Sequence, residues 1–210
     1  MKLKLALTAA VLALAAPAQA HEVWVERDAG GPARIYLGEP GEVLPEGGDP
    51  EFHHLKAPRL VPASDAAQRR DAGFIEVAVP DGDVRLIDDN VFEPWEADGK
   101  KEAVIYYARA GRAETRSLLP LEIAPVEAGG QQFVLLRGGK PVAASGLTVI
   151  TPEKWSKTFT TDAEGRLAVP VREKGRYILT AAMKEEGDLK AGSQPVGVIH
   201  HITTTTFVVE

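Results

Sequence analysis

The chain contains no cysteine. This absence excludes disulfides and thiolate metal ligands, so any metal site must be built from nitrogen and oxygen atoms. Aromatic residues make up only 6% of the sequence, and no row of them suggests a polysaccharide-binding surface. Helical periodicity is scarce, which argues against an α-helical fold. After residue 16 no apolar run approaches the length of a membrane span, so we expect no membrane insertion of the mature chain.

Residues 1–20 have the pattern of a secretory signal peptide. Lys2 and Lys4 supply the positively charged start, an apolar stretch follows, and Ala18-Gln19-Ala20 is a small-residue cleavage site. Cleavage after Ala20 makes His21 the first residue of the mature protein, and we expect a periplasmic location. Loss of the two lysines takes the 24 basic residues to 22 and the net charge from −6 to −8. An acidic mature chain argues against nucleic acid as a partner.

Short strands separated by turn residues dominate the rest of the chain. The expected strands are residues 22–26, 33–37, 74–79, 84–87, 103–108, 119–123, 132–136, 142–149, 158–161, 166–171, 174–182 and 202–209. The turn at 80–83 predicts a hairpin between its two flanking strands. Turns at intervals of about 8–12 residues favour an all-β fold with a β-sandwich. A Gly-rich stretch at 126–130 predicts a boundary between an N-terminal β-rich domain, residues 21–126, and a C-terminal sandwich domain, residues 131–210.

The five histidines fall in three places, which are His21, the pair His53 and His54, and the pair His200 and His201. An N-terminal histidine offers a primary amine and an imidazole nitrogen that can hold one metal ion together, and imidazole suits copper, nickel and zinc. We predict a shared site that contains His21 and one ring from each pair, because neighbours in an extended strand point to opposite faces. His54 and His201 are slightly favoured over His53 and His200, without a strong physical reason. A planar set of nitrogen ligands favours copper(II) or nickel(II) over zinc.

Carboxylates are expected to orient the ring N–H groups of metal-binding histidines. Glu22, Asp49 and Glu51 lie nearest in sequence to the candidate ligands. They are the predicted supporting residues.

Two resemblances to known families extend this interpretation. Residues 131–210 resemble the carboxypeptidase-regulatory-like group of immunoglobulin-type sandwiches in three motifs, Gly139-Lys140-Pro141-Val142, Thr161-Asp162-Ala163-Glu164-Gly165 and Gly175-Arg176-Tyr177. The whole mature chain resembles a family of secreted bacterial proteins, defined as a domain of unknown function and associated with nickel uptake. The motifs that carry this second resemblance are His21-Glu22-Val23-Trp24, Ile35-Tyr36-Leu37-Gly38-Glu39 and a Thr-rich final strand preceded by histidine. The resemblances imply an immunoglobulin-like sandwich, periplasmic binding of nickel or copper, and a metal uptake transporter as partner.

Three functions follow from these patterns. The favoured one is a carrier or scavenger of copper(II) or nickel(II). The second is a copper-dependent oxidative enzyme, because an N-terminal histidine and a second histidine are also the copper ligands of polysaccharide monooxygenases. The third is a metal-free sandwich interaction module in which the histidine pairs are incidental. Ser145 and Ser193 lack any nucleophile motif, so we expect a binding protein rather than an enzyme.

Overall fold

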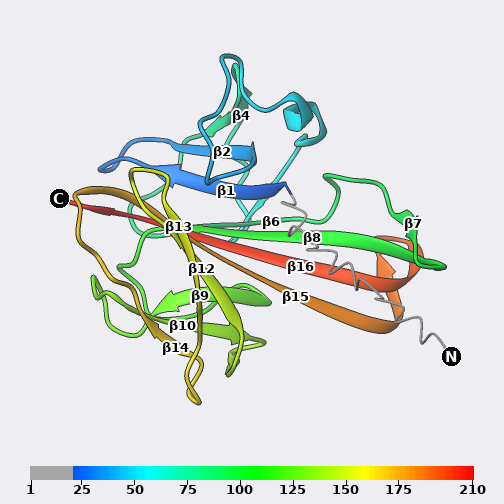
Figure 1. Ribbon diagram of the computed structural model, residues 1–210. Coiled ribbons are helices and arrows are strands. Elements are labelled where there is room, and N and C mark those ends of the chain that lie inside the picture. The colour runs from blue at the N-terminus through cyan, green and yellow to red at the C-terminus, as the bar shows by residue number, and fades with distance from the viewer. Residues whose placement is uncertain (1–20) are drawn as a thin grey trace, which may run out of the picture.

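The computed structural model describes residues 21–210, and the predicted signal peptide lies outside the described residues. The described chain forms three β-sheets and one short 3-10 helix, and residues 21–210 contain no α-helix (Figure 1). The prediction of an all-β fold is therefore confirmed. The immunoglobulin type of the sandwich stays a prediction.

The first sheet has the order β1-β2-β5-β4. Its strands are β1 (Glu22–Arg27), β2 (Ala33–Gly38), β5 (Ile75–Val77) and β4 (Gln68–Arg70), and the 3-10 helix η1 (Pro50–His54) lies between β2 and β4 in the chain. The second sheet contains β9 (Leu121–Pro125), β10 (Gln132–Arg137), β11 (Lys140–Pro141) and β14 (Arg166–Ala168).

The third and largest sheet has the order β13-β12-β15-β16-β8-β6-β3, with β7 paired to β8. Its strands are β3 (Arg59–Leu60), β6 (Val84–Asp88), β7 (Trp95–Ala97), β8 (Lys100–Ala110), β12 (Gly146–Ile150), β13 (Ser156–Thr160), β15 (Gly175–Ala191) and β16 (Gln194–Val209). β16 pairs antiparallel with β15 and parallel with β8. We call this third sheet the central sheet.

Threonine hydroxyls of β16 join the central sheet to the other two sheets. The Thr204 hydroxyl donates to the Val23 carbonyl of β1 at 2.8 Å, and the Thr205 hydroxyl donates to the Ile123 carbonyl of β9 at 2.7 Å. Since successive side chains of a strand point to opposite faces, the first sheet covers one face of β16 and the second sheet covers the other. The same alternation places His200 on the β1 side and His201 on the β9 side.

The predicted hairpin between residues 74–79 and 84–87 is wrong. β5 pairs with β2 and β4, whereas β6 pairs with β8 and β3, so the turn at 80–83 carries the chain from one sheet to another. A turn sequence fixes a reversal of the chain, but the apolar partners available on other strands decide the pairing. The last strand also begins earlier than expected, at Gln194. His200 and His201 therefore lie well inside a strand and do not open one.

The predicted domain boundary at 126–130 lies in the turn that connects β9 and β10, two strands that pair with each other. The central sheet combines β8 from before this turn with β12, β15 and β16 from after it. This shared sheet counts against two separately packed domains. Independent folding of residues 131–210 stays a prediction.

Candidate metal centre

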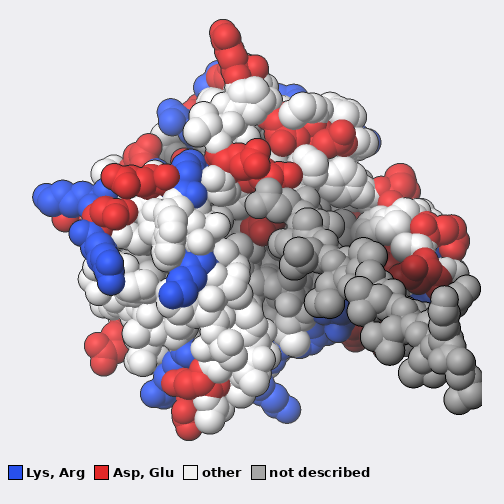
Figure 2. Space-filling model, viewed as in Figure 1, with Lys and Arg blue, Asp and Glu red and all other residues white. Residues whose placement is uncertain are grey.

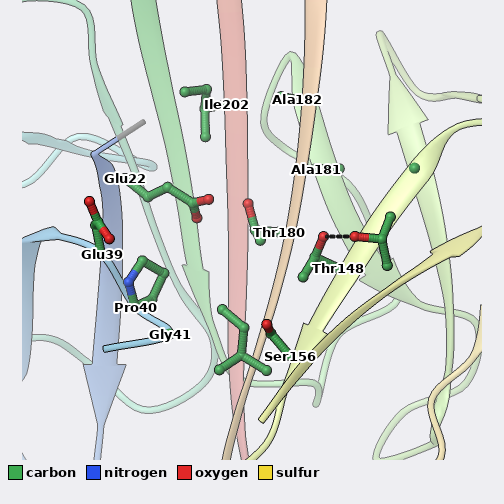
Figure 3. A pocket seen from close by; sticks show the side chains of 13 residues that line it. Glu22, Glu39, Pro40, Gly41, Thr148, Ser156, Thr180, Ala181, Ala182 and Ile202 are labelled. Carbon is green, nitrogen blue, oxygen red and sulfur yellow. Dashed lines mark hydrogen bonds between the residues drawn. The ribbon is translucent and has the colours of Figure 1, made fainter. Parts of the chain in front are cut away.

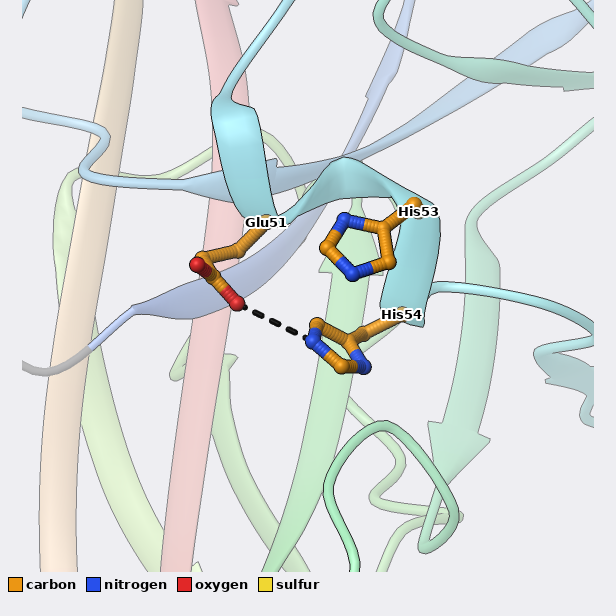
Figure 4. A group of neighbouring side chains, drawn as sticks. All are labelled: Glu51, His53 and His54. Atoms are coloured by element: carbon orange, nitrogen blue, oxygen red, sulfur yellow. Dashed lines mark ion pairs between the residues drawn. The ribbon is translucent and has the colours of Figure 1, made fainter.

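Glu51, His53 and His54 form the group of side chains best suited to hold a metal ion. One ligand atom from each residue lies within 4.8 Å of the others, and within residues 21–210 no second set of three such side chains meets this criterion. Glu51 Oε2 lies 3.0 Å from His54 Nε2, and the two imidazole centroids are 4.0 Å apart (Figure 4). Two imidazoles and a carboxylate therefore converge on one point of η1.

The local sequence explains why these three side chains converge. Asp49 is the N-cap of η1, and its Oδ1 accepts the backbone N–H of Glu51 at 2.7 Å. Pro50 follows at the first helical position, where its fixed φ suits a helical start. A 3-10 helix has about three residues per turn, so Glu51 and His54 lie on the same side. The expectation that His53 and His54 would point to opposite faces of a strand is therefore wrong.

Hydrogen bonds define which nitrogen atoms of this pair face a ligand. His53 Nδ1 lies 2.9 Å from the Pro50 carbonyl oxygen. Because a carbonyl only accepts, Nδ1 carries the proton and Nε2 keeps its lone pair for a metal. His54 Nε2 faces the Glu51 carboxylate, and a metal ion bound between these two groups would replace the proton that they share. His53 is exposed and the other two residues are half-buried, so the group is open to solvent.

His21 lies beside this group. Its Nε2 is 3.1 Å from Asp49 Oδ1, the same oxygen that caps η1. The Phe92 ring packs against both imidazoles, with centroid distances of 6.3 Å to His21 and 5.1 Å to His54. The predicted contacts of Asp49 and Glu51 with candidate histidines are therefore present, and the structure brings the first and second histidine positions together.

His200 lies elsewhere in the molecule. Its Nε2 is 2.6 Å from Glu102 Oε2, and its ring stacks on Trp95 with a centroid distance of 5.9 Å. His200 therefore has a carboxylate and an aromatic partner of its own at the β7–β8 side of the central sheet. The structure does not place it in the group on η1.

His201 is buried on the opposite face of β16. Its Nδ1 is 3.0 Å from the Tyr107 hydroxyl and its Nε2 is 2.9 Å from Glu185. Burial lowers the pKa of His201, and the hydrogen bond to Glu185 opposes this shift. Both ring nitrogens have protein partners, so the structure does not bring His201 to the group on η1 either.

Phe92 is the site residue that sequence reasoning missed. It lies in the irregular segment between β6 and β7, nearly forty positions after His54, and no local pattern marks it as a neighbour of the histidines. Its position depends on long-range packing, because Phe92 also packs against the core of the first sheet.

No protein-family model, curated protein or solved structure matches this chain. The family resemblance drawn from the sequence therefore stays a prediction. No helix within residues 21–210 is long and apolar enough to cross a membrane.

Proposed function

We propose that this protein binds a copper(II) or nickel(II) ion at η1 and acts as a periplasmic carrier or scavenger. The observation that carries the proposal is the convergence of Glu51, His53 and His54 within 4.8 Å. Imidazole nitrogen suits both metals, and nitrogen and oxygen sites generally bind copper(II) more tightly than the other divalent first-row ions.

His21 is the proposed additional ligand. Cleavage after Ala20 would give His21 a free amine, which can chelate a metal together with its own Nδ1. Asp49 already contacts Nε2, so Nδ1 is the nitrogen left for the chelate, and a carboxylate on the second ring nitrogen is the usual support for a metal-bound histidine. A free α-amine has a pKa of about 7.7–8.0, so its deprotonation at pH 7 costs only about 1 kcal/mol.

The exposure of the group supports transport or storage of an ion. His53 is open to solvent, and acidic side chains gather over the β2 and η1 region at the top of the view in Figure 2. A surface site with neighbouring carboxylates can take up a cation and release it to another protein. A metal uptake transporter is the partner that the proposal implies.

A competition titration of copper(II) and nickel(II) against a chromogenic chelator tests the proposal on protein that begins at His21. The His53→Ala/His54→Ala double variant should lose at least about tenfold in affinity, because loss of an outer-shell partner alone costs about 10–100-fold. His200→Ala is the matched control and should keep the affinity, because its ring pairs with Glu102 elsewhere. Unchanged affinity in the double variant would overturn the proposal.

A second titration tests His21 separately. Protein with one extra alanine before His21 has an amide in place of the amine, and an amide is a poor ligand. We expect at least about tenfold weaker binding in that protein. Equal affinities would remove His21 from the site and leave the group on η1.

The immunoglobulin-like sandwich of residues 131–210 belongs to the same proposal. Its support is an apolar core in which β10 of the second sheet packs against β12 and β15 of the central sheet, and β9, which precedes residue 131, completes the same core. The residues of this core include Leu121, Ile123, Phe133, Leu135, Leu147, Val149, Tyr177 and Leu179.

A further inference from the structure

A cavity of about 500 Å³ lies beside the start of β1. Its walls come from β1, the chain after β2, and strands β12, β13 and β15, as Figure 3 shows. The volume falls within the range of small-molecule sites, about 300–1,000 Å³. The cavity is therefore large enough for a small organic ligand.

Two consecutive residues at the start of β1 point toward different sites. His21 points toward Asp49 and Phe92. Glu22 and Trp24 point the other way, and Trp24 packs on Ile150 and Ile178. Glu22, the first residue of β1, thus serves the cavity, and His21, the residue before it, belongs to the candidate metal centre.

The Glu22 carboxyl group points into the cavity toward Thr180 (Figure 3). Glu22 Oε2 is buried and has no hydrogen-bond partner among the described residues. A buried polar atom without a partner is destabilising, and native structures leave few of them. A donor group on a bound ligand would satisfy this oxygen.

The remaining lining residues define the chemistry of such a ligand. Glu39 adds a second carboxyl group, and none of the described residues that line the cavity is Lys, Arg or His. Hydroxyl groups come from Thr148, Ser156, Thr158 and Thr180, and apolar surface comes from Pro40, Ile150 and Ile202. Negative charge without a basic residue favours a cation, and the apolar wall favours a ligand with an aliphatic part.

We propose that this cavity binds a small aliphatic amine, with an ammonium group donating to Glu22 and the chain lying along the apolar wall. A metal ion fits less well, because the described residues give no group of three metal-ligating side chains here. Glu39 follows β2 and adds its own carboxyl group to the cavity, so a ligand with an amine at each end can pair with both carboxyl groups.

Isothermal titration calorimetry with 1,4-diaminobutane tests the proposal on metal-free protein that begins at His21. The neutral control ligand is 1,4-butanediol, which has the same chain without the charges. We expect saturable binding of the diamine and at least about tenfold weaker binding of the diol, the effect of losing a charge-assisted hydrogen bond. Absence of diamine binding at millimolar concentration, or equal binding of the two ligands, would overturn the proposal.

Variants locate the binding. Glu22→Gln should weaken diamine binding by about tenfold or more, whereas Glu46→Gln, an exposed residue that does not line the cavity, should bind like the unmodified protein. Equal affinity of Glu22→Gln and unmodified protein would also overturn the proposal. If Glu22→Gln lacks a cooperative thermal transition, Glu39→Gln takes its place and should show the same loss. Metal titration of these proteins is a separate measurement. A negative result for diamine binding would therefore leave the proposal of a metal site unchanged.

Discussion

Asp49 connects His21 to the candidate metal centre, and its substitution should separate two effects. One carboxylate oxygen caps η1 through the Glu51 N–H at 2.7 Å and also lies 3.1 Å from His21 Nε2. Asp49→Ala removes both contacts. Asp49→Asn keeps an N-cap acceptor but loses the negative charge beside the imidazole.

The contact with the Glu51 N–H affects the stability of the protein, whereas the contact with His21 affects its affinity for metal. Loss of an N-cap side chain costs about 1 kcal/mol of stability, and Asn caps about as well as Asp. Loss of a carboxylate behind a metal-bound histidine costs about 10–100-fold in affinity, or about 1.4–2.8 kcal/mol. We therefore expect Asp49→Ala to lose both stability and affinity. Asp49→Asn should keep its stability and show an intermediate loss of affinity, because a neutral amide oxygen supports the ring less strongly.

Urea denaturation and copper(II) competition on protein that begins at His21 measure the two quantities. Asp65→Ala is the matched control, because Asp65 is exposed and its loss removes one negative charge of the same kind. If Asp49→Ala bound copper(II) as tightly as the unmodified protein, the role assigned to Asp49 and His21 would be refuted. An affinity loss of equal size in Asp65→Ala would show that net charge alone is responsible.

Three further predictions concern stability. Glu122→Gln should cost about 3–5 kcal/mol in chemical denaturation, because Glu122 is buried at 2.8 Å from both Arg85 and Arg109; a loss below 1 kcal/mol would contradict this. Burial raises the pKa of Glu22 from 4.5 to about 7, and the nearby Thr180 hydroxyl opposes this shift. The stability linked to its protonation is present below pH 4.5 and is lost as pH rises through 7. Glu22→Gln should therefore have a higher melting temperature than the unmodified protein at pH 8, and this difference should shrink toward pH 4.5. Isolated residues 131–210 should show no cooperative melt by circular dichroism, since β16 loses its neighbour β8; a sharp transition would support the predicted domain boundary.

Local sequence patterns predicted much of the strand content and part of the site. Residues 22–26 and 33–37 are strands, as predicted from short apolar segments next to turn residues. The contact of His54 with Glu51 was also within reach, because the two residues are three positions apart. The contact of His21 with Asp49 was not, because it joins residues 28 positions apart. A short 3-10 turn at Pro50 was not expected, since five residues carry too little periodicity to distinguish it from an irregular loop.

The long-range arrangement could not be read from such patterns. Parallel pairing of β8 with β16 joins segments about a hundred residues apart. The sequence of neither segment identifies the other as its pairing partner. The same applies to His200 and His201, whose partners Glu102 and Tyr107 both come from β8. A histidine pair indicates a capacity to bind metal. The neighbouring strands decide whether the ring nitrogens already form hydrogen bonds with carboxylates and hydroxyls.

The position of β16 has a consequence for the order of folding. This strand lies between β8 and β15 and contacts both outer sheets through its threonines, yet it contains nearly the last residues of the chain. The central sheet cannot close while residues 194–209 are still being synthesised, and pairings between distant segments form slowly. Until then β8 and β15 would present open edges that favour association with other chains. The central sheet of a chain with this topology is complete only after its final strand has been released.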